Sequence, residues 1–151
     1  MKVLGITGCE PQAGASLIEG ALPALRNAGL KVSVLVEAHD DFDLDRPGKD
    51  SYEHRRAGAL EVALSSAQRW ALMHECESLK APALTDLVAQ LSEVDILVVL
   101  GFEAELRESL ADGQTGAAQW SLLTAPTDGD PKTIAGLILA EHARTPAPQR
   151  S

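Results

Sequence analysis

An apolar run at residues 94–100, VDILVVL, constrains the fold of this chain more than any other feature. A strand that is apolar at nearly every position is buried on both faces, as in the middle of a parallel sheet. Further strands are predicted at 2–7, 31–36 and 119–124. Parallel strands need crossover connections, usually helical. We therefore predict an α/β fold, a three-layer domain with a largely parallel sheet and helices on both faces.

The helices of this domain are predicted from apolar periodicity and from their end signals. Helices are expected over residues 16–28, 52–58, 85–91 and 131–143, with a short helix and a loop within 103–117. A glycine-punctuated loop, 8–15, precedes the first helix, in which Pro23 costs about 3 kcal/mol or introduces a kink. Ser51 is the expected N-cap of the second helix, and Asp130 followed by Pro131 opens the last one.

Two short strands at 61–65 and 69–74 are predicted to form a hairpin. The 151 residues suit one domain, which we place at residues 1–144, followed by a disordered tail at 145–151. The apolar stretches 62–64 and 70–73 of the hairpin contain Trp and Met, residues that are favoured in interface cores.

The charge balance excludes several classes of protein. The chain has 13 Lys and Arg against 22 Asp and Glu, a formal net charge of −9 at pH 7. So acidic a chain does not suit nucleic-acid binding or docking on an anionic membrane. No apolar run approaches the roughly 20 residues of a spanning helix, and the N-terminus lacks a signal-peptide pattern. Two cysteines, Cys9 and Cys76, make no disulfide framework, so we expect free thiols and a cytoplasmic protein.

The order of strand, glycine loop and helix at the N-terminus is that of a P-loop NTPase. Residues 39–51, followed by 57–59 and 69–72, are more specific: they resemble the MobB family, the GTP-binding accessory proteins of molybdopterin guanine dinucleotide synthesis. The resemblance runs from residue 2 to about residue 143. It implies a P-loop NTPase-like fold, a homodimer, and GTP with Mg²⁺ as ligands. The apolar stretches of the hairpin are the expected dimer seam.

A working P-loop reads Gly-x-x-x-x-Gly-Lys-[Ser/Thr], with the lysine on the β- and γ-phosphates and the hydroxyl on Mg²⁺. Counted from Gly8, Ala13 stands at the second glycine, Gly14 at the lysine and Ala15 at the hydroxyl, with Ser16 next. Three working positions are therefore lost. The candidate cofactor-binding residues implied by the resemblance are Gly8, Gln12, Ala13, Gly14, Ala15 and Ser16.

Two further positions weaken an anion site. Leu100 ends a strand where the resemblance implies an acid that orients Mg²⁺, and Val36, Glu37 and Asp40 follow another strand where the family usually has lysine and histidines. Like charges about 4 Å apart near a protein surface repel by about 4 kcal/mol. GTP is therefore expected to bind weakly or not at all, with no appreciable hydrolysis. The triple change Ala13→Gly, Gly14→Lys and Ala15→Thr is expected to raise GTP affinity.

No metal site or catalytic residue is predicted. His54, His74 and Cys76 lack the spacing of metal ligands, and only His39 with the acids of residues 41–45 offers a weaker alternative for a divalent ion. Cys9 lies near a helix N-terminus, which lowers a thiol pKa, but Glu10 opposes this effect. An inert Cys9 is the simpler interpretation.

Two functions remain open. The first is a MobB-like accessory protein of molybdenum-cofactor synthesis that retains weak nucleotide binding at the N-terminus of the first helix. The second is a non-catalytic adaptor that keeps the fold and the partner surface without nucleotide. The resemblance implies a molybdenum-cofactor nucleotidyltransferase or a molybdoenzyme maturation protein as the partner of either one.

Overall fold

The computed structural model describes residues 1–38, 45–76, 81–112 and 118–144. The chain forms two compact units, one of Met1–Glu37 with Ala83–Ser151 and one of Ala38–Pro82. The tail predicted at 145–151 and the candidate metal ligand His39 lie outside the described residues. A single domain over 1–144 stays a prediction.

The first unit is built on a four-stranded sheet in the order β2-β5-β1-β6, with every neighbouring pair parallel. Its strands are β1 (Lys2–Thr7), β2 (Val32–Val36), β5 (Ile96–Leu100) and β6 (Gln119–Thr124). Each follows one of the predicted apolar runs to within two residues at either end. All five residues of β5 are buried, as the apolar run predicted, because helices cover both faces of the sheet.

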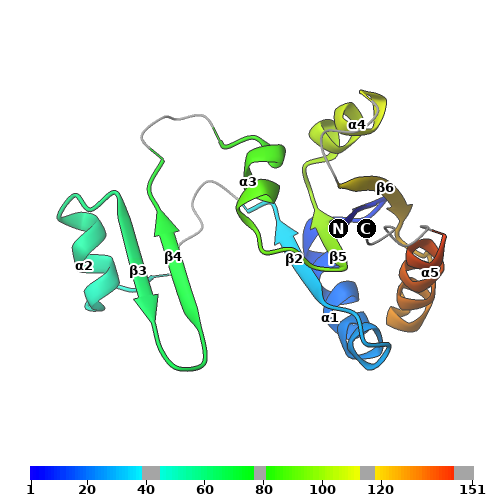
Figure 1. The fold of residues 1–151 in the computed structure, drawn as a ribbon, viewed down its shortest axis with the longest axis horizontal. Helices are drawn as coiled ribbons and strands as arrows, with labels where there is room; N and C mark the ends of the chain where they lie inside the picture. Colours follow the sequence, from blue (N-terminus) through cyan, green and yellow to red (C-terminus); the bar gives the residue numbers. More distant parts are fainter. Residues whose placement is uncertain (39–44, 77–80, 113–117, 145–151) are drawn as a thin grey trace, which may run out of the picture. The chain divides into compact units, whose positions relative to one another are not determined.

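Four helices complete this unit in Figure 1: α1 (Pro11–Asn27), α3 (Leu84–Gln90), α4 (Glu103–Ala111) and α5 (Pro131–Ala143). The helices α1 and α5 pack on one face of the sheet, whereas α3 and α4 pack on the other. The predicted three-layer α/β fold is therefore confirmed. No helix in the described ranges is long and apolar enough to cross a bilayer.

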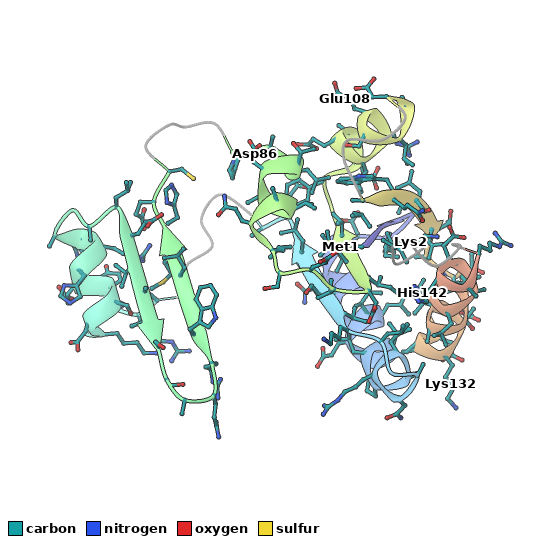
Figure 2. All side chains as sticks on the ribbon, viewed as in Figure 1. Met1, Lys2, Asp86, Glu108, Lys132 and His142 are labelled. Atoms are coloured by element: carbon teal, nitrogen blue, oxygen red, sulfur yellow. The ribbon has the colours of Figure 1, made fainter. Side chains whose placement is uncertain are left out.

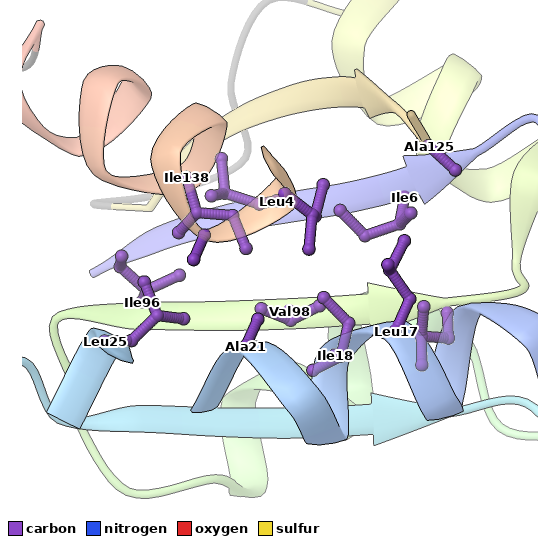
Figure 3. Close-up of a cluster of buried hydrophobic side chains, with 13 residues drawn as sticks. Leu4, Ile6, Leu17, Ile18, Ala21, Leu25, Ile96, Val98, Ala125 and Ile138 are labelled. Carbon is purple, nitrogen blue, oxygen red and sulfur yellow. The ribbon is translucent and has the colours of Figure 1, made fainter. Parts of the chain in front are cut away.

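Aliphatic side chains fill the larger core, which lies between the sheet and the pair α1 and α5 (Figure 3). Alternate residues of β1 and β5 point to this face, among them Leu4 and Val98, and meet Ile18 of α1 and Ile138 of α5. All four are at most 1% exposed. The smaller core uses the intervening residues of the same strands, so each central strand contributes to both cores.

The helix α1 begins earlier than the sequence predicted. Pro11 is its first residue, so the expected loop over 8–15 was wrong. Proline suits a first helical position, because its fixed φ is already helical and no N–H is needed there. Pro23 also lies inside the helix without ending it. The expected first-turn capping by Asp130 is confirmed in α5, where its carboxylate accepts from the Lys132 N–H at 2.9 Å.

A buried ion pair joins the start of β1 to the end of α5. The Lys2 ammonium lies 2.9 Å from Glu141 Oε1 and also donates to the Glu141 main-chain oxygen at 2.7 Å. The Ser121 hydroxyl of β6 donates to the same carboxylate at 3.0 Å. Figure 2 labels Lys2 and the neighbouring His142. These contacts tie both ends of the unit to one another.

The second unit consists of α2 (Asp50–Arg56) and the antiparallel pair β3 (Glu61–Ser65) and β4 (Trp70–His74). The predicted hairpin is confirmed. Ser51 is not the N-cap of α2, because Lys49 takes that position and the buried Ser51 hydroxyl donates instead to Asp45 at 2.9 Å. Arg55 of α2 pairs with Asp45 and with Glu75 just after β4, which fixes the helix to both flanking segments.

Two helical glycines should respond oppositely to alanine. A methyl group on Gly20 of α1 would lie 2.6 Å from Pro131 Cγ, so Gly20→Ala should force α1 and α5 apart and cost about 1–3 kcal/mol. Gly136→Ala is the matched control, because nothing lies within 4 Å of its added methyl group. That change should stabilise the protein by about 0.5–1 kcal/mol. Urea unfolding measures both, and equal effects would contradict the close helix crossing.

Candidate functional site

The candidate site lies at the carboxyl ends of β1 and β5, the two central strands of the sheet. The helices that follow these neighbouring strands, α1 and α4, cover opposite faces. In open α/β sheets, ligands bind at the carboxyl edge where the connections diverge in this way. Topology therefore places a ligand site beside Gly8 and Gly101, the residues that follow the two strands.

The connection from β1 to α1 is short. Gly8, with φ of +80°, turns the chain, and only Cys9 and Glu10 follow before the helix begins. Gly8 therefore lies in the turn. The other five candidate residues lie in the first two turns of α1: Gln12, Ala13, Gly14, Ala15 and Ser16.

Two of the groups that a P-loop would direct at phosphate are used within this helix. The Gly14 N–H donates to the Glu10 carbonyl at 2.9 Å, and the Ser16 hydroxyl donates to the Gln12 carbonyl at 3.2 Å. Pro11 has no N–H to donate. A P-loop instead presents successive free N–H groups in an open loop, which is what cradles the phosphates. Residues 11–16 do not have that backbone.

Two substituted positions, Gly14 and Leu100, lie close together beside the first turns of α1. A methyl group on Gly14 would lie 3.0 Å from Leu100 Cδ2 and 3.2 Å from Cys9 Sγ. Leu100 is 1% exposed and belongs to the larger core, against which Cys9 and Ala15 also pack. A side chain at residue 14, the position of the expected lysine, would therefore press against Leu100, which stands at the position of the expected strand-end acid.

Glu37 has a structural role that the sequence did not indicate. Its N–H donates to the Leu100 carbonyl at 2.9 Å, and its Oε2 accepts from the Phe102 N–H at 2.6 Å. Phe102 has a φ of +54°, an unusual value for a residue other than glycine, and it forms the N-cap of α4. From the sequence, Glu37 is expected only as a charge that repels phosphate. Nothing in the sequence links residues 37 and 102, so only the structure could reveal this bond.

The electrostatic environment of the site is acidic. Burial raises the pKa of the Cys9 thiol, and the nearby carboxylates of Glu10 and Glu103 raise it further. Cys9 is therefore a protonated thiol at neutral pH, consistent with an inert role, since the thiolate is the reactive form. Glu10 also places a negative charge at the positive end of the α1 dipole, where a bound anion would otherwise lie.

The residues present do not fit Mg²⁺ and a triphosphate. Neither Ala15 nor Leu100 has a side-chain oxygen for the metal, and Gly14 has no cationic side chain for the phosphates. Among the described residues, no group of three or more His, Cys, Asp or Glu side chains is placed to hold a metal ion.

Away from this site, a hollow of about 190 Å³ lies between α3 and α4. Its lining includes Glu105, Glu108 and Asp112, so it too would repel phosphate. None of its lining residues is among the candidate cofactor-binding residues.

The sequence model of one protein family matches residues 3–117, most of the chain. That family is described as molybdopterin guanine dinucleotide synthesis protein B, or MobB. The match includes the candidate site and the hairpin.

Two curated relatives are named molybdopterin-guanine dinucleotide biosynthesis adapter protein. The one from Escherichia coli (strain K12) is 39% identical over 92 residues, which cover 60% of this chain and 53% of the relative. The one from Haemophilus influenzae is 34% identical over 108 residues, which cover 70% of this chain and 59% of the relative. The chain thus spans somewhat over half the length of these relatives.

Solved structures share the fold. A crystal structure of molybdopterin-guanine biosynthesis protein B superimposes with a TM-score of 0.59 at 20% identity, covering 94% of this chain and 99% of that one. The Bacillus subtilis MobB structure gives a TM-score of 0.55 at 18% identity, with coverages of 93% and 98%. Identities this low establish the fold alone.

Proposed function

Because the chain belongs to the MobB family, we propose that it is an adapter protein in the biosynthesis of molybdopterin guanine dinucleotide. The family match over residues 3–117 carries this proposal. The names of the Escherichia coli and Haemophilus influenzae relatives support it. The partner would be a molybdenum-cofactor nucleotidyltransferase or a molybdoenzyme maturation protein, which the adapter contacts in the cytoplasm. Free thiols at Cys9 and Cys76 suit that compartment.

The adapter would work without hydrolysing GTP. The family implies GTP and Mg²⁺ as ligands, but Gly14 and Ala15 replace the lysine and the metal-binding hydroxyl. Catalysis of phosphoryl transfer consists almost entirely of positioning and charge stabilisation, both of which depend on those groups. We therefore propose a role that rests on surface contacts.

Complementation tests the adapter role. The full chain is expressed in a bacterial strain that lacks its own MobB, and the activity of a molybdoenzyme that needs the guanine dinucleotide cofactor is measured. We expect activity above the empty-vector level. A purified nucleotidyltransferase should also bind the chain in a pull-down, and failure of both assays would contradict the proposal.

The adapter is further proposed to be a homodimer that pairs through the β3–β4 hairpin. Trp70 is 71% exposed, and Leu72, which lies on the same face of the hairpin, is nearly half exposed. Large apolar side chains exposed together on one face of a hairpin are typical of interface cores, where Trp is enriched.

Trp70→Ser should weaken this dimer. Interface tryptophans are often hot spots, so we expect the dimer Kd to rise at least about 30-fold. Sedimentation velocity over a range of concentrations measures the change. Gln68→Ala, at an exposed polar residue of the same hairpin, is the control and should leave the Kd unchanged. A monomeric wild type, or no response to Trp70→Ser, would contradict the seam.

A further inference from the structure

We infer that residues 8–16 of this chain do not bind nucleotide, because α1 already begins at Pro11 and Leu100 crowds any side chain placed at residue 14, which couples residues 14 and 100. The family implies GTP as a ligand, and this chain differs from that expectation in its own residues. It does not depend on the adapter role, which rests on the family match and on surface contacts.

The helical backbone at the start of α1 is the first obstacle to nucleotide binding. The helix α1 already begins at Pro11, so the segment that a P-loop holds open is helical. The Gly14 N–H is committed to the Glu10 carbonyl, and the proline offers no N–H at all. A phosphate group at this place would receive no N–H from Pro11, and the Gly14 N–H would have to leave the Glu10 carbonyl, whatever side chains stood at residues 13–15.

Crowding between residues 14 and 100 is the second obstacle to nucleotide binding. A methyl group on Gly14 would already lie 3.0 Å from Leu100 Cδ2, closer than an ordinary contact. A lysine there would have to push its stem past Leu100, which is buried in the larger core with Ile6 and Leu17. Conversely, an acid at residue 100 would enter that apolar core. Neither the lysine nor the acid of a working site can therefore return without a change at the other position.

Negative charge around the site is the third obstacle to nucleotide binding. Glu10 lies at the N-terminus of α1, and the carboxylates of Glu10 and Glu103 both act on Cys9. Glu37 is fixed nearby by its bond to the Phe102 N–H. An incoming triphosphate would meet these carboxylates, and no lysine follows in the motif to offset them.

Calorimetry on the full chain tests nucleotide binding directly. Titration with Mg²⁺ and GTP up to about 1 mM, the concentration that half-fills a site with a Kd of 1 mM, should give no saturable heat. The triple variant Ala13→Gly/Gly14→Lys/Ala15→Thr should behave in the same way. The sequence alone predicts a rescue by that variant, whereas the early start of the helix predicts none. Saturable binding by the wild type, or a Kd below about 100 μM for the variant, would overturn the inference.

Thermal unfolding tests the coupling. Gly14→Lys should lower the melting temperature of the wild type. In a Leu100→Ala background the same change should lower it by at least about 3 °C less, since the obstructing side chain is gone. Leu97→Ala is the matched control, because Leu97 is a buried leucine of the same strand that belongs to the other core. An equal effect of Gly14→Lys in all three backgrounds would overturn the coupling.

The outcomes separate this inference from the adapter proposal. A chain that complements and also binds GTP would refute only the inference. A chain that fails both the complementation and the pull-down assay, and that does not bind GTP, would refute only the adapter role.

Discussion

Leu100→Glu should strongly destabilise the first unit at neutral pH. Leu100 is 1% exposed and contacts the site of Gly14, where no cation is available to pair with a new carboxylate. An unpaired buried charge costs several kcal/mol, and we expect a loss of at least about 4 kcal/mol, against a total of about 5–15 kcal/mol for a typical domain. Urea unfolding followed by circular dichroism measures this loss.

The pH dependence of this variant identifies the cause. Burial would raise the pKa of the new carboxyl above the usual value of about 4.3. The folded state would then hold a proton that the unfolded state releases, so stability should increase as pH falls from 7.5 towards 5. Leu100→Gln has the same shape without the charge and should show no such increase. Parallel pH profiles for the two variants would show that the position is not buried among apolar groups.

Glu141→Gln should have the next largest effect. It breaks the ion pair with Lys2, whose side chain is only 7% exposed. Removing one partner of a buried ion pair typically costs about 3–5 kcal/mol. Lys2 keeps other partners, among them the Glu141 main-chain oxygen, so we expect a loss of about 2–3 kcal/mol at pH 7. Chemical denaturation measures the change.

This contribution should disappear in acid. The hydrogen bonds from Lys2 and from Ser121 hold the pKa of the Glu141 carboxyl below its usual value. Its stabilisation is therefore complete above about pH 4.3 and is lost as pH falls through the lowered value in the folded state. The difference between wild type and Glu141→Gln should shrink between pH 5 and pH 3. Glu108→Gln, at an exposed glutamate of α4, is the control and should stay within about 0.5 kcal/mol of wild type throughout.

The secondary structure was largely predictable where short-range signals decide it. The apolar run 94–100 marked a strand buried on both faces, and Asp130 with Pro131 marked the start of α5. The start of α1 was not predictable in the same way, because the glycines near it favoured a loop that Pro11 and the following residues fold into helix. The P-loop motif also predicts an open loop at these residues, which the structure shows to be helical from Pro11 onwards.

The sequence predicts which chemical groups the candidate site lacks. The sequence showed that Gly14 and Leu100 stand where a lysine and an acid are expected. It did not show that these two residues touch, so a rescue by restoring the motif looked feasible. The structure places Leu100 where it would crowd a side chain at residue 14, and on this ground we expect the restored motif to fail.

Local patterns in the sequence specify the order of the elements and the parallel sheet, because periodicity and caps act over a few neighbouring residues. The pairs of distant residues emerge only in the folded chain: Glu37 bonds to Phe102, Lys2 pairs with Glu141, and Leu100 lies beside Gly14. Such contacts depend on strand register and on the packing of helices against the sheet. Those are set by the whole core at once, so no local stretch of sequence encodes them.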